Sequence, residues 1–235
     1  MKGQVLLLLS IVIMVLTGCM YPQDELAQNQ IPYEDQVQAV QSAVKQFQED
    51  NGGILPIKTK EMDTPIYEKY PIDFNRISPK YLAEPPGNAY ESGGVFQYVL
   101  VDVEENPTVK IFDLRMAEKI KDINLLIRLQ KYPPYKEEIT KGVYTMDFKK
   151  IGYEEEPFVV SPYTNQNLSF VITGSGEVFV DYRSDLYQAM QNGSCKKTAG
   201  EDIRDCLLED SLFVPAFSLP YTMDEKTKEP IFLVD

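Results

Sequence analysis

The sequence predicts an α+β body in which helices pack on an antiparallel β-sheet, and three observations support this fold class. Apolar residues recur at helical spacing in two segments, 34–49 and 116–131. Short runs of β-branched and aromatic residues are bounded by glycine, proline and asparagine, as strands are. A pattern that spans residues 70–77 returns at 144–151, which points to two related helix-plus-hairpin halves.

Each predicted helix has an apolar stripe and a clear end. In 34–49 the stripe consists of Val37, Val40, Val44 and Phe47, and Asn51-Gly52-Gly53 ends the helix because glycine readily adopts the left-handed conformation. In 116–131 the stripe is formed by isoleucines and a leucine, and Pro133-Pro134 follows it. We interpret both stripes as faces that pack against the core of the same chain.

The predicted strands form hairpins. Residues 95–103 pair with 109–114 across Asn106-Pro107, and 168–173 pair with 177–182 across Gly174-Ser175-Gly176. A short helix is expected at 184–190. The last apolar run, 231–234, is expected to close the fold as a strand.

The repeated pattern reads Tyr-x-[Ile/Met]-Asp-Phe-[Asn/Lys]-[Arg/Lys]-Ile. It defines candidate repeat units at 33–114 and 116–182, followed by a closing segment, 183–235. We extend the match to the strands that begin at Val95-Phe96 and Val178-Phe179 and end at Asp102 and Asp181. Three interpretations of the pattern remain open: a symmetric ligand site at Asp73 and Asp147, two turns capped by these aspartates, or coincidence.

The N-terminus predicts export and lipid attachment. After Lys2, residues 5–16 are apolar apart from Ser10, a run shorter than the ~20 residues of a bilayer span. Leu16-Thr17-Gly18-Cys19 follows and resembles the lipobox of bacterial lipoproteins. The resemblance implies cleavage between Gly18 and Cys19, a diacylglycerol on the Cys19 thiol and acylation of the new α-amine. An ordinary cleaved signal and an uncleaved short anchor are the alternatives.

This resemblance sets the domain organisation: a signal peptide over 1–18, a lipidated tether over 19–32 and an extracytoplasmic body over 33–235. It places the protein at the cell membrane, on the extracytoplasmic face, with the lipid bilayer as a partner through Cys19 and palmitate among its acyl chains.

Composition excludes several kinds of chemistry and partner. The net charge is −13, so phosphate backbones repel the chain and we expect no nucleic acid partner. Histidine is absent, which excludes Ser-His-Asp and Cys-His nucleophile pairs and imidazole metal sites. We assign no catalytic, cofactor-binding or metal-ligating residue and expect no cofactor. Chemistry based on paired carboxylates is still compatible with the composition.

Once Cys19 carries lipid, two cysteines are left in the body. Cys195 and Cys206 lie close in sequence and on the oxidising side of the membrane, which favours a structural disulfide. Two free thiols or a functional pair are the alternatives.

Two resemblances to known families follow from longer segments. Residues 43–53 (AVKQFQEDNGG), 80–90 (KYLAEPPGNAY) and 93–99 (GGVFQYV) resemble the globular head of type II secretion pseudopilins. The chain lacks the processing site of that family, because the fifth residue from Cys19 is Gln23 in a polar segment. Most of the chain is similar to the uncharacterised YphF-type lipoproteins of Gram-positive spore formers, through AVKQFQEDNGGILPIKT, DTPIYEKYPIDF, GGVFQYVLVD and VDYRSDLYQAM. That resemblance implies an outward-facing lipoprotein and no particular activity.

The leading functional hypothesis is therefore a non-enzymatic binding or envelope-interaction module whose partner is an envelope protein or a glycan. The alternatives are a cell-wall hydrolase that uses carboxylates and an accessory of a pilus-like export machine.

Overall fold

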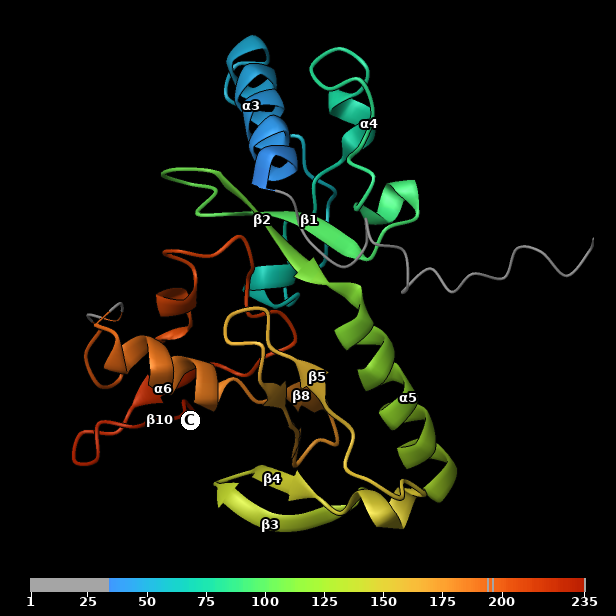
Figure 1. The fold of residues 1–235 in the computed structure, drawn as a ribbon, viewed down its shortest axis with the longest axis vertical. Helices are drawn as coiled ribbons and strands as arrows, with labels where there is room; N and C mark the ends of the chain where they lie inside the picture. The colour runs from blue at the N-terminus through green and yellow to red at the C-terminus, as the bar shows by residue number, and fades with distance from the viewer. Residues whose placement is uncertain (1–33, 194, 196, 235) are drawn as a thin grey trace, which may run out of the picture.

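A computed structural model describes residues 34–193, 195 and 197–234 (Figure 1). The predicted α+β class is confirmed by helices and antiparallel strands in this part of the chain. The α-helices are α3 (Glu34–Asp50), α4 (Phe74–Ile77), α5 (Leu114–Gln130) and α6 (Arg183–Gln191). The strands are β1 (Phe96–Val101), β2 (Thr108–Asp113), β3 (Tyr135–Thr140), β4 (Val143–Met146), β5 (Val159–Val160), β6 (Asn167–Leu168), β7 (Phe170–Thr173), β8 (Val178–Val180), β9 (Tyr221–Met223) and β10 (Pro230–Phe232). Short 3₁₀ turns are η2 (Ile66–Glu68), η3 (Tyr90–Ser92), η4 (Phe148–Ile151) and η5 (Arg204–Leu207).

The first unit consists of α3, α4 and the β1–β2 hairpin, which lie together at the top of Figure 1. The four residues of the predicted stripe on α3 are buried, and they share one hydrophobic cluster with both strands. Gln41 fixes the helix to β2, since its side chain donates to Pro107 O at 3.0 Å and accepts from Val109 N at 2.7 Å. Asn51 and two glycines end α3, as predicted.

The second unit is built on a four-stranded antiparallel sheet of order β3-β4-β7-β8, against which α5 packs. One large hydrophobic cluster joins this sheet to α5, α6, η5 and the β9–β10 hairpin. The expected short helix after residue 183 and the expected closing strand near residue 231 are both present, as α6 and β10.

The segment that leads from the second unit back to the first contains Phe213. This segment runs parallel to β2: Ile111 N donates to Leu212 O at 2.9 Å, and Val214 N donates to Ile111 O at 3.0 Å. A third cluster forms at this junction from Tyr67, Val99, Phe112, Val214 and Ala216. The late segment therefore closes the core between the two units.

The two copies of the repeated pattern adopt the same local structure. Asp73 has φ −91° and ψ 92°, and Asp147 has φ −90° and ψ 87°. The backbone N–H of each donates at 2.8 Å to a proline carbonyl earlier in the chain, from Asp73 to Pro56 and from Asp147 to Pro134. Both copies then continue into one short helical turn whose Phe and Ile are buried.

The extension of the repeat to the Val-Phe strands is wrong. Phe96 begins the first strand of its hairpin, whereas Phe179 lies in the second strand of the other hairpin. Asp102 lies in the β1–β2 turn with a φ of 50°, so it does not correspond to Asp181. The counterpart of Asp181 is Asp113, since each lies at the end of the second strand of a hairpin and accepts from the backbone N–H of the arginine two residues later.

Candidate functional site

The residues predicted for lipid attachment, Gly18 and Cys19, lie outside the described residues. No helix in residues 34–193, 195 and 197–234 is long and apolar enough to cross a membrane.

The other predicted pair, Cys195 and Cys206, forms a disulfide with an S–S distance of 2.06 Å. It links the chain after α6 to the buried η5 turn, and Cys206 is itself 7% exposed. The bond spans 11 positions, so it restricts a loop in the unfolded chain.

Removal of this disulfide, in the variant Cys195→Ala/Cys206→Ala, is expected to lower the free energy of unfolding by about 3 kcal/mol. The loss arises because the open chain gains conformational freedom that the bond had removed. Urea unfolding of the full chain measures it, and wild-type protein reduced with dithiothreitol is the matched control. Equal unfolding midpoints for the variant and the oxidised wild type would contradict the structural role.

The repeated aspartates do not form a common site. Asp73 caps α4 by accepting from Asn75 N at 3.2 Å, and its corner belongs to the core of the first unit. Asp147 makes no such cap bond and instead pairs with Lys150 at 3.5 Å, next to the core of the second unit. The turn-capping interpretation thus fits Asp73, while Asp147 is held by an ion pair.

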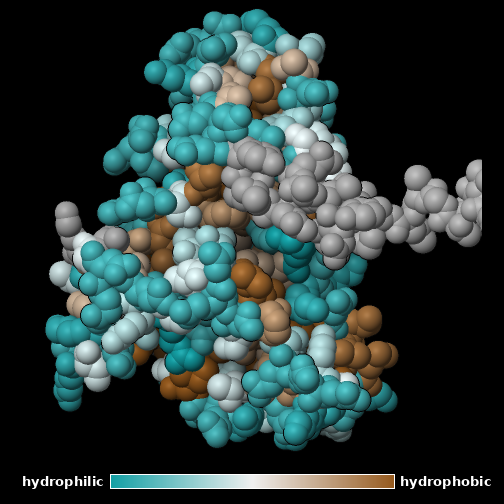
Figure 2. Space-filling view, in the orientation of Figure 1, coloured by the Kyte–Doolittle hydropathy of each residue, from teal (hydrophilic) through white to brown (hydrophobic). Residues whose placement is uncertain are grey.

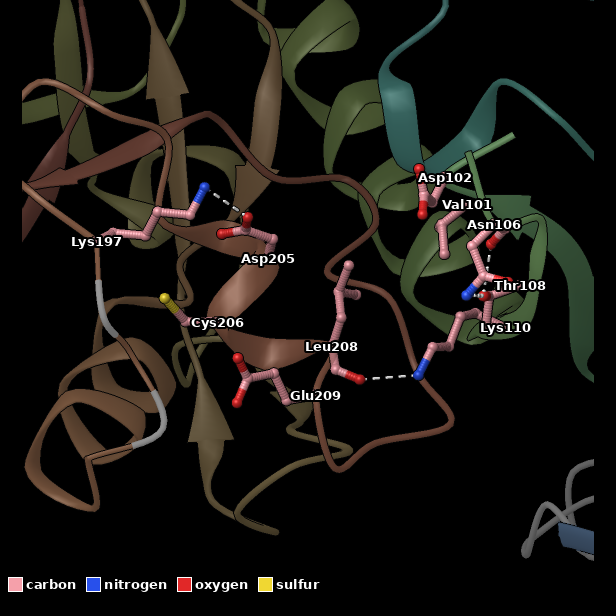
Figure 3. Close-up of a pocket in the computed structure, with 10 residues that line it drawn as sticks. All are labelled: Val101, Asp102, Asn106, Thr108, Lys110, Lys197, Asp205, Cys206, Leu208 and Glu209. Carbon is pink, nitrogen blue, oxygen red and sulfur yellow. Dashed lines mark hydrogen bonds and ion pairs between the residues drawn. The ribbon is translucent and has the colours of Figure 1, made fainter. Parts of the chain in front are cut away.

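A cavity of about 520 Å³ lies where the β1–β2 turn faces the segment that follows α6 (Figure 3). The β-hairpin side contributes Asp102, Asn106, Thr108 and Lys110, and the opposite side contributes Lys197, Asp205, Cys206, Leu208 and Glu209. We call this space the junction cavity. It is large enough for a small ligand.

Both cations of the junction cavity are already bound by the protein. Lys110 Nζ donates to Leu208 O at 2.8 Å and also to Ser211 O, so this lysine fastens β2 to the late segment. Burial lowers the pKa of Lys110, in opposition to the charge of Asp210. Lys197 Nζ pairs with Asp205 Oδ2 at 2.8 Å.

The remaining polar groups of the cavity are mostly acceptors. Asp205 Oδ1 is buried and has no hydrogen-bond partner in the described part of the chain. Asp102 and Glu209 form no ion pair with the described residues. The cavity is therefore suited to a ligand that donates hydrogen bonds, such as one rich in hydroxyl or ammonium groups.

A second polar centre lies at the start of α6. Asp185 is 1% exposed, and its Oδ1 accepts from Ser161 Oγ at 2.9 Å and Thr164 Oγ1 at 2.7 Å. Burial raises the pKa of Asp185, although the two hydroxyl donors lower it. Since Ser161 Oγ also accepts from Tyr163 N and Thr164 N, Asp185 holds the 161–165 turn in place.

Neither polar centre was predicted from the sequence. Lys110 was part of an ordinary strand pattern, and its role depends on carbonyl groups 98 and 101 positions away. No group of three acidic or cysteine side chains in the described ranges is arranged to hold a metal ion.

The fold and the junction cavity define an α+β protein of two packed units with a ligand-sized space between their connecting segments. Residues 33–113 match the model of the YphF family N-terminal domain, which supports a YphF-family protein. The match ends at the last residue of β2, so it coincides with the first structural unit. The searches of curated proteins and of solved structures gave no match.

Proposed function

We propose that the protein is an extracytoplasmic lipoprotein, anchored through Cys19, whose body binds a component of the cell envelope without transforming it. The lipobox-like sequence supports the anchor. The junction cavity supports the binding role, because its cations are engaged within the protein and it is lined by the carboxylates of Asp102 and Glu209, which form no ion pair with the described residues. Wall glycan, a polymer rich in hydroxyl groups, is the ligand class that we propose for this cavity.

The anchor is tested by expression of the full chain in a bacterial host that processes lipoproteins. Wild-type protein is expected in the membrane fraction, cleaved and labelled by radioactive palmitate, whereas Cys19→Ser is expected to accumulate as an unlabelled precursor. Cys195→Ser is the matched control, since it replaces a cysteine of the body and leaves the lipobox unchanged. Normal processing and membrane recovery of Cys19→Ser would overturn the anchor.

The ligand is tested by calorimetric titration of soluble wall-glycan strands into the full chain in detergent. The variants Glu209→Gln and Asp102→Asn are expected to weaken binding by about tenfold each, because each removes one charged acceptor. Glu154→Gln, at an exposed acidic loop, is the control and is expected to bind as the wild type does. Absence of glycan binding to the wild type would overturn the proposed ligand.

A hydrolase is the second candidate, because three carboxylates, Asp102, Asp205 and Glu209, line the same cavity. Most glycoside hydrolases use two carboxylates at a defined separation. The two candidates differ in one measurement, the release of reducing ends from the glycan during the titration. Release that disappears in Asp205→Asn or Glu209→Gln would favour the hydrolase over the binding module.

A further inference from the structure

An apolar groove of about 490 Å³ lies between β5, the start of α5 and the end of the β1–β2 hairpin opposite its turn. Its apolar wall is formed by Phe96, Met116, Phe158, Val160 and Phe213. It shares no lining residue with the junction cavity. The groove is thus a separate feature from the site proposed above.

The rim of the groove exposes large apolar side chains on a strand edge. Phe158 is 50% exposed and Val160 is 53% exposed, at alternate positions of one extended segment. Figure 2 shows apolar atoms in the middle of this face, in the region where Figure 1 labels β5. Apolar side chains exposed beside a groove are typical of interaction surfaces.

The main chain of β5 is open on one side. Among the described residues, β5 pairs only with β6, and its register brings Val160 opposite Asn167. Ser161 N donates to Gln166 O at 2.8 Å, so the alternation of an antiparallel pair directs the N–H and C=O of Val160 away from β6. These groups lie where an added strand would pair.

The groove also carries positive charge in a chain whose net charge is −13. Asp113 in its wall is bound by Arg115, whose Nε lies 2.9 Å from Asp113 Oδ1. Lys119, one turn further along α5, lines the groove and forms no ion pair with the described residues. The ammonium group of Lys119 therefore gives the groove a positive charge, which attracts a carboxylate.

We propose that β5 and this groove bind an extended segment of a partner polypeptide in which apolar side chains alternate with acidic ones. The segment pairs with the main chain of Val160 as an added strand. Its apolar side chains contact Phe158, Val160 and the groove wall, and one of its carboxylates pairs with Lys119. This surface goes beyond the glycan site and does not depend on it.

The probe for the test is a fluorescein-labelled peptide of alternating valine and glutamate, titrated into the full chain in detergent and followed by fluorescence anisotropy. A peptide of alternating valine and lysine is the charge-reversed control. Saturable binding of the glutamate peptide, at least about tenfold tighter than that of the lysine peptide, is expected. No saturable binding, or equal affinity for both peptides, would overturn the proposal.

Two variants examine the contacts separately. Val160→Pro removes the outward N–H and leaves the pairing with β6 intact, so it is expected to weaken binding of the glutamate peptide about tenfold. Its control, Val160→Thr, keeps the N–H and is expected to bind the peptide within about twofold of the wild-type affinity. Lys119→Glu is expected to reverse the preference between the two peptides, and it serves as the second variant if Val160→Pro unfolds. An unchanged affinity in Lys119→Glu would overturn the role of charge.

A second copy of the chain is the competing occupant of the same edge. Sedimentation equilibrium of the full chain distinguishes the two occupants. A dimer that dissociates in Val160→Pro would overturn the proposal, because the strand edge would then bind a second copy of the chain. A monomer that binds the glutamate peptide supports the proposal.

Discussion

Replacement of Gly94 by alanine is expected to lower the free energy of unfolding by about 3–5 kcal/mol, a very large effect for one methyl group. A Cβ at this position would lie 2.1 Å from both the carbonyl carbon and the carbonyl oxygen of Asn88. Both groups are main chain, so the contact is relieved only by moving the backbone. That movement would disturb the bond from Phe96 N to Asn88 O, at 3.1 Å, which leads into β1.

The same movement would reach the core through Asn88, which is fully buried and accepts from Tyr98 OH at 2.8 Å. Urea unfolding of the full chain measures the loss. Gly87→Ala is the matched control, because a Cβ there meets nothing within 4 Å, and it is expected to change stability by at most about 1 kcal/mol. A Gly94→Ala variant as stable as Gly87→Ala would contradict the close approach.

Replacement of Arg204 by alanine is expected to lower the free energy of unfolding by about 3 kcal/mol. Arg204 belongs to the junction of the units, where its guanidinium lies 5.0 Å from the ring centroid of Tyr67. Its side chain is 10% exposed, pairs with Asp202 at 2.7 Å and donates to both oxygens of Ser218 at 3.2 Å. Removal of the Arg204 side chain leaves the buried carbonyl and hydroxyl of Ser218 without this donor. It also leaves a void beside Tyr67.

The control for Arg204 is a second arginine with the same local geometry. Arg183 also pairs with the aspartate two residues before it, at 2.6 Å, but its side chain is 34% exposed. Asp181 is buried but keeps the hydrogen bond from the backbone N–H of residue 183, and water reaches the arginine side chain, so Arg183→Ala is expected to lose less than Arg204→Ala, about 1–2 kcal/mol. Thermal unfolding of both variants makes the comparison, and equal losses would show that burial at the junction is not the cause.

The elements that the sequence predicted well are those whose apolar pattern matches a local period. The buried stripe of α3 and the β1–β2 and β7–β8 hairpins lie close to their predicted positions. In each of these elements the core contacts come from neighbours on one face of a helix or from residues across a short turn. The spacing of apolar residues along the sequence therefore predicts such contacts directly.

Two elements were missed because their contacts do not follow a pattern within the element. β3 has a polar sequence, Tyr-Lys-Glu-Glu-Ile-Thr, and three consecutive exposed residues, and it pairs with β4 through an irregular register. The segment at Phe213 pairs with Ile111 in parallel, far away in sequence. The position of β3 is determined by its pairing with β4. The position of the segment at Phe213 is determined by the space between the two units.

The polar sites were missed for a similar reason. Asp185 lies in the first turn of α6, and its buried carboxylate accepts from Ser161 and Thr164, which belong to another segment. Glu68 accepts from Phe217 N across 149 positions, and burial raises its pKa. From sequence alone, roles can be predicted for residues that belong to a local motif, as for Cys19, and not for residues whose role is defined by their surroundings in the fold.

The return of the late segment to the first unit has a consequence for the order of folding. The chain is synthesised from its N-terminus, yet the carbonyl groups that hold Lys110 and the amide that binds Glu68 come 98 or more positions later. Until those residues have emerged, β2 keeps an open edge and Tyr67 lacks part of its cover. The first unit is therefore completed only after Phe217 has been synthesised, so a chain that stops before this residue lacks part of the cover of the first unit even though residues 34–113 contain a core of their own.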